Sequence, residues 1–263
     1  MGSDAVIASS IVAVVVLAVI LAVRSTRRAK ANRMQLQQAL GLTPVEPTAE
    51  LTSRVNRLYH TTRRTVGDDP GTYMLRNVTG RSMGDGALFV LDVIETSGTE
   101  DNLSESQTIL IASPDLELPP FVMFPRVDVD GALRSFANRV IDWVVSKWGD
   151  PVGFPDSPEF ERRYVVSSTD QEATRMFLAR RGGESAPERS RQEAARPNER
   201  APAGELLRGL AETRLLTVHA AGDTFTVSRV ELARKPALPL LEERINEAVA
   251  VFSLFRSRSL ELR

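Results

Sequence analysis

An uncharged apolar run near the N-terminus constrains this chain more than any other feature. Ala5–Val23 holds 19 residues without a charge, and Ser9 and Ser10 are its only polar side chains. At about 1.5 Å of rise per residue, a helix of this length spans about 28 Å, close to the thickness of the hydrocarbon core of a bilayer. The run therefore predicts a transmembrane helix.

A cleaved signal peptide is the alternative interpretation of this run. Only Asp4, and no basic residue, is charged before it, and the run is longer than the usual signal-peptide core of about 7–15 apolar residues. The small-x-small triplet Ala29-Lys30-Ala31 lies beyond several cationic residues. These features favour an anchor that is not cleaved.

Basic residues follow the apolar run and none precedes it. The topology-determining cluster consists of Arg24, Arg27, Arg28, Lys30 and Arg33. The positive-inside rule then predicts a single-pass protein of the cell (plasma) membrane, with its N-terminus outside and its C-terminal domain in the cytoplasm. The lipid bilayer is thus one expected partner, and the sequence leaves open whether the cluster also binds specific lipid headgroups.

The composition excludes several classes of protein. With 42% hydrophobic and 25% charged residues, the chain is too apolar to be wholly disordered and too charged to be a polytopic membrane protein. A net charge of −1 offers no electrostatic footprint for nucleic acid, so no nucleic-acid partner is expected. The absence of cysteine excludes a disulfide scaffold, a thiolate metal cluster and a cysteine nucleophile.

Hydrophobic periodicity predicts the first elements after the anchor. Helical spacing favours a helix within Val45–Thr62, with Thr48 as its N-cap. Alternating patterns predict strands at Thr72–Arg81, Ala87–Glu95 and Gln107–Ala112, the first two joined by a hairpin loop at Gly84-Asp85-Gly86. Prolines bracket Leu118–Pro125, which is typical of a short edge strand.

The second half of the chain alternates helices and strands. We expect an amphipathic helix from Leu133 to Trp148, then a strand at Glu159–Ser167, and then a helix opened by a capping box from Thr169 to Glu172. Arg181–Ala203 lacks core-forming side chains and is expected to be a mobile insertion. The expected elements after it are a helix at Glu205–Thr213, strands at Arg214–Ala220 and Thr224–Val230, and a final helix at Leu238–Phe255.

Hairpins outnumber possible βαβ crossovers in this order of elements. The expected fold class is α+β, with an N-terminal transmembrane helix followed by an antiparallel-sheet cytoplasmic domain with flanking helices. The expected divisions are an extracytoplasmic N-terminus and anchor (1–23), a basic stalk with a short helix (24–65), the α+β domain (66–256, with a disordered insertion at 181–203) and a C-terminal tail (257–263). A split into two domains near Pro151 stays open.

No constellation of residues predicts a catalytic, cofactor-binding or metal site, and no cofactor is expected. His60 and His219 are the only histidines, and neither has the spacing of a metal ligand. A lone histidine on a strand, as expected for His219, is typically structural. There is no Gly-x-Ser-x-Gly motif that would indicate a serine hydrolase.

The segment from Glu159 to Thr174 contains a strand-to-helix pattern that is similar to a known family motif. It contains Phe160, Tyr164 and Val166 in a Phe-x-x-x-Tyr-x-Val strand pattern, followed by Asp170, Glu172 and Ala173 at a helix start. This resembles a motif of an uncharacterised family of bacterial single-pass membrane-anchored proteins.

The upstream Leu118-Pro119-Pro120-Phe121 is similar to an element of the same family. The resemblance covers roughly Tyr73 to Phe255, and departs from the family pattern at Thr174-Arg175 and by the long insertion after Arg181. It implies a fold and a membrane address, and it carries no known activity.

The sequence is compatible with two classes of function. The leading hypothesis is a cytoplasmic binding or scaffolding domain with a protein partner at the membrane face, and the alternative is a membrane-tethered enzyme of unknown reaction. A deep pocket lined by His219 and carboxylates would favour the enzyme, and an apolar patch near Trp143 or Trp148 would favour the interaction module. At the motif, Tyr164 and Val166 are expected in the core with Thr169 as the helix cap; alternatively, Tyr164, Asp170 and Glu172 face a ligand.

Overall fold

The computed structural model describes residues 38–63, 72–96, 104–126, 148–179, 205–213, 216–228 and 238–262. The chain divides into two compact units, Met1–Thr43 and Pro44–Arg263. In the first unit, residues 38–43 are described, and they include a helical turn that ends at Gly41 with a φ of 68°. That positive φ is typical of a glycine that ends a helix.

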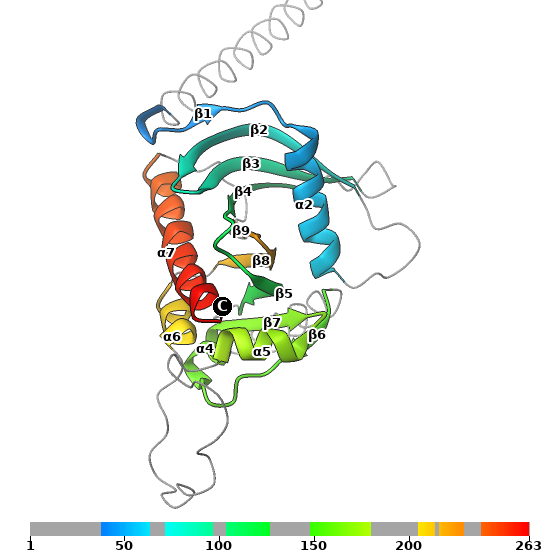
Figure 1. The fold of residues 1–263 in the computed structure, drawn as a ribbon, viewed down its shortest axis with the longest axis vertical. Coiled ribbons are helices and arrows are strands. Elements are labelled where there is room, and N and C mark those ends of the chain that lie inside the picture. The colour runs from blue at the N-terminus through cyan, green and yellow to red at the C-terminus, as the bar shows by residue number, and fades with distance from the viewer. Residues whose placement is uncertain are drawn as a thin grey trace, which may run out of the picture. The chain divides into compact units, whose positions relative to one another are not determined.

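The second unit is built on a nine-stranded sheet (Figure 1). The strand order is β1-β2-β3-β4-β9-β8-β5-β7-β6, and from β2 to β6 every neighbouring pair is antiparallel. The strands are β1 (Thr43–Pro44), β2 (Thr72–Met83), β3 (Gly86–Thr96), β4 (Ser104–Ala112), β5 (Leu118–Pro125), β6 (Asp150–Val152), β7 (Tyr164–Ser168), β8 (Thr217–Gly222) and β9 (Thr224–Ser228).

The helix α2 (Ala49–Thr62) covers one face of this sheet. Thr48 caps it as predicted, because its side-chain oxygen accepts a hydrogen bond from the backbone N–H of Leu51 at 3.1 Å. The apolar stripe of α2 packs into a core whose buried members are Leu51, Val55, Tyr59, Tyr73, Leu75, Val78, Leu91, Val93 and Leu110.

The helices α4 (Pro158–Arg163), α5 (Gln171–Ala179), α6 (Glu205–Glu212) and α7 (Leu238–Leu262) complete the domain. Side chains alternate between the faces of a strand, so Ile111 and its cross-strand partner Phe225 face away from the α2 core. Phe225 lies 5.2 Å from Phe255 of α7, ring centroid to centroid. The helix α7 therefore covers the opposite face from α2.

The expected fold class is corrected by this architecture. The described residues form an antiparallel nine-stranded sheet domain with few helices. Among these ranges, no helix combines the length and the hydropathy that crossing a bilayer requires. Even α7, with 25 residues, carries Glu242, Glu243, Arg244 and Glu247 within one stretch, and such charges are costly in a bilayer core.

The predicted transmembrane helix at Ala5–Val23 and the basic cluster lie outside the described residues, as do the expected helix up to residue 147 and the insertion at 181–203. Trp148, the last residue of that expected helix, is described and half-buried.

The strand Leu118–Pro125 is not at an edge of the sheet, so the prediction made from its prolines is wrong. β5 lies between β8 and β7, and β7 and β6 separate it from the nearer edge of the sheet. Its register with β8 shifts between Leu118 and Phe121, where Pro119 and Pro120 lie, and Pro125 is its last residue. Pro119 and Pro120 thus lie where the pairing with β8 is irregular, and Pro125 lies at the strand end. At both places the missing backbone N–H removes no regular hydrogen bond between strands.

The predicted strand at Glu159–Ser167 is wrong in its first half. Residues Pro158–Arg163 form α4, and the strand β7 begins at Tyr164. Proline suits the first position of a helix, and the acidic residues Glu159 and Glu161 lie in the first turn, where they complement the helix dipole. Tyr164 and Val166 are each 2% exposed, which confirms that both face the core.

The helix cap at the motif is Asp170 and not Thr169. The carboxylate of Asp170 accepts a hydrogen bond from the backbone N–H of Ala173 at 3.0 Å, and its carbonyl accepts one from Thr174. The Thr169 hydroxyl instead lies 3.4 Å from the carbonyl oxygen of Thr61. Asp170 and Glu172 are both exposed. The N-cap is therefore shifted by one residue from the prediction, and Ala173 at the third helical position has no side chain that could complete a capping box.

Candidate functional site

His219 of β8 lies in a cluster of aromatic rings beside α2. Its ring centroid is 4.7 Å from that of Tyr59, 4.7 Å from that of Trp148 and 6.0 Å from that of Phe124. These residues come from α2, from the segment before β6 and from β5, so strand pairing and the packing of α2 assemble the cluster. Trp148 and Phe124 are half-buried, whereas His219 and Tyr59 are buried.

Burial dominates the electrostatics of this cluster. It lowers the pKa of His219 from 6.5 to about 3, because a charged imidazolium would lose its hydration. The Nδ1 atom lies 3.5 Å from the hydroxyl of Thr62. Burial likewise raises the pKa of the Tyr59 hydroxyl to about 12, although hydrogen bonds with Thr226 and Thr108 oppose the shift. At neutral pH both side chains are therefore uncharged.

Arg63, which ends α2, links this cluster to the edge of the sheet. One guanidinium nitrogen lies 2.6 Å from Glu95 Oε1 on β3 and 3.2 Å from the Tyr73 hydroxyl on β2. The guanidinium carbon also lies 5.5 Å from the ring centroid of Trp148, in a cation–π arrangement. Arg63 thereby holds the end of α2, two strands and Trp148 together.

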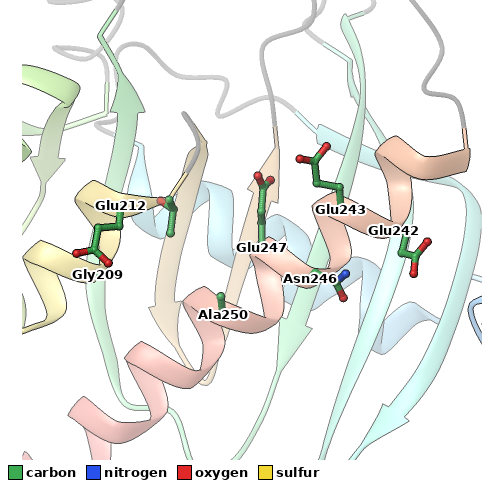
Figure 2. A pocket seen from close by; sticks show the side chains of 8 residues that line it. Gly209, Glu212, Glu242, Glu243, Asn246, Glu247 and Ala250 are labelled. Carbon is green, nitrogen blue, oxygen red and sulfur yellow. The ribbon is translucent and has the colours of Figure 1, made fainter.

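A groove between α6 and α7 forms an open hollow on the described part of the domain (Figure 2). It has a volume of about 560 Å³. Glu212 and Thr213 line it at the end of α6, and the remaining lining residues belong to the two helices: Gly209, Glu242, Glu243, Asn246, Glu247 and Ala250.

Close helix packing positions the walls of the groove. Gly209 lets α6 approach α7, because a Cβ atom at this position would lie 3.0 Å from both methyl groups of Leu254. The end of α6 is fixed from the other side, since the carbonyl oxygen of Thr213 accepts a hydrogen bond from Arg163 at 2.9 Å. The Tyr164 hydroxyl lies 3.3 Å from Thr213 Oγ1. The motif segment thus supports the groove through Tyr164.

The side chains of the groove are acidic. Four carboxylates line it, and the eight lining residues include no lysine, arginine or histidine. Glu243 and Glu247 are four residues apart on α7 and point to the same side of the helix (Figure 2). A hollow lined by charges of one sign raises the local concentration of ions of the opposite sign. The arrangement suits the binding of a cation.

The structure separates the residues that the sequence singled out. His60 is exposed on α2, while His219 is 5% exposed and lies on β8. Trp148 contacts His219, whereas Trp143 lies outside the described residues. In the described part of the chain, no group of His, Cys, Asp and Glu has the arrangement of a metal site.

Sequence reasoning missed the carboxylates of the groove. The only available signal was the spacing of Glu242, Glu243 and Glu247 along one predicted helix. Its counterpart, Glu212, is about thirty residues away in the sequence and joins the site only through helix packing. No family model, no curated protein and no solved structure matches this chain.

Proposed function

We propose that this domain is a binding module that holds a cationic segment of a protein partner in the groove between α6 and α7. The observation that carries the proposal is that four carboxylates, three on α7 and one at the end of α6, line one open groove. Charge complementarity of this kind directs association and selects partners. A binding module also agrees with the leading hypothesis from the sequence.

The dimensions of the groove favour a peptide. A volume of about 560 Å³ is in the range of sites that hold several side chains or a small molecule. Glu243 and Glu247 point to the same side of α7 (Figure 2), and the helix rises by about 6 Å between them. Side chains two residues apart on an extended peptide are separated by about 7 Å. A segment with alternating basic residues would therefore match the spacing of the carboxylates along α7.

The alternative, an enzyme, receives less support from the same residues. An accessible histidine would be the expected general base, but His219 is buried among aromatic rings and its pKa is lowered to about 3. It does not line the groove. A histidine-based active site would need the imidazole to line an open hollow. Here the hollow lies between α6 and α7, whereas the imidazole lies on β8.

A peptide-binding measurement tests the proposal. The probe is a short fluorescein-labelled peptide in which Arg and Ala alternate, titrated with the purified full chain at low salt. The double variant Glu243→Gln, Glu247→Gln should bind it about tenfold more weakly, since each ion pair with these partly exposed carboxylates should contribute about 1 kcal/mol. Glu212→Gln tests the wall formed by α6 and should also weaken binding.

The matched control is the double variant Glu159→Gln, Glu172→Gln, which removes two exposed carboxylates elsewhere on the domain. Its affinity for the peptide should stay within about twofold of the parent, because the long-range effect of exposed charges is screened. Equal affinities of the groove variant and this control would overturn the proposal. A peptide that alternates Glu and Ala should not bind the parent chain.

The location of the module at the cell membrane remains a prediction from the sequence, and the binding proposal does not depend on it. A reporter fused after Arg263 tests this prediction, because it should be active in the cytoplasm if the C-terminal domain lies there. Activity only on the outer side would contradict the predicted location.

A further inference from the structure

No further inference is drawn: the strongest candidate, the aromatic cluster at the C-terminal end of α2 where half-buried Trp148 and Phe124 lie against His219, carries none because nothing in the described residues shows what covers it.

Discussion

The side-chain amide of Asn56 hydrogen-bonds with both backbone polar groups of Tyr73. Its Nδ2 donates to the Tyr73 carbonyl oxygen at 3.0 Å, and its Oδ1 accepts from the Tyr73 N–H at 2.9 Å. Both groups lie on the edge of β2 that faces away from β3, so one amide on α2 replaces a neighbouring strand at this point. An open strand edge can pair with another chain, and Asn56 closes part of this one.

Replacing Asn56 with alanine should therefore destabilise the domain by about 1–3 kcal/mol, because two backbone groups beside buried Tyr73 lose their partner. Urea denaturation of the purified chain measures this difference. Ser53→Ala, at an exposed position of the same helix, is the matched control and should be neutral or slightly stabilising. A loss below about 0.5 kcal/mol for Asn56→Ala would contradict the structural role of the amide.

Acid should destabilise the domain through His219. The folded state binds its proton with a pKa of about 3, whereas the ordinary value is 6.5. Below pH 6.5 the unfolded state gains a proton that the folded state does not, so stability falls as the pH decreases from 6.5 towards 3. Between pH 7 and pH 5 this one group should account for a loss of about 2 kcal/mol.

The measurement is the free energy of unfolding of the parent and of His219→Gln across this pH range. The variant should lose less stability on acidification, by about the same 2 kcal/mol. His60→Gln, on the exposed side of α2, is the control and should follow the parent. Parallel curves for the parent and His219→Gln would show that the imidazole is not held neutral.

The cap of α5 provides a direct comparison between neighbouring residues. Asp170→Ala should cost about 1 kcal/mol, because it removes the acceptor for the Ala173 N–H. Thr169→Ala should cost less, since the Thr169 hydroxyl makes a long, exposed hydrogen bond to the carbonyl oxygen of Thr61, at 3.4 Å. Thermal denaturation of both variants under the same conditions decides the order. If Thr169→Ala is the more destabilising of the two, the assignment of the cap is wrong.

Buried Arg258 of α7 holds the C-terminal end of α5. Its side chain donates to the carbonyl oxygens of Phe177 at 2.9 Å and of Met176 at 3.1 Å, and pairs with Glu261 at 2.7 Å. Arg258→Lys should cost about 2 kcal/mol, because an ammonium cannot reproduce the geometry of the guanidinium fork. Exposed Arg256, which pairs with Asp115, is the control, and Arg256→Lys should cost less than about 1 kcal/mol.

Local patterns predicted the elements whose causes are local. The hairpin of β2 and β3 follows from alternating side chains and from the turn at Gly84, whose φ of 60° is one that glycine adopts readily. The start of α2 follows from Thr48. His219 was expected on a strand, and it lies on β8.

The sequence could not predict features that depend on strand order and on helix packing. The position of β5 inside the sheet depends on β8, about a hundred residues later, and no local pattern encodes that pairing. The same holds for the groove, where Glu212 and Glu247 come from separate helices. The predicted N-cap of α5, Thr169, differs by one residue from the observed cap, Asp170, and helix ends are commonly misplaced by one or two residues.

The strand order also has a consequence for biosynthesis. β4 and β5 follow each other in the chain, but the hairpin of β9 and β8 lies between them in the sheet. β4 and β5 are synthesised about a hundred residues before Thr217, so neither can pair with its neighbour β9 or β8 until that hairpin has been made. Unpaired edges favour aggregation. Chains truncated before Thr217 should therefore aggregate more readily than the full-length chain.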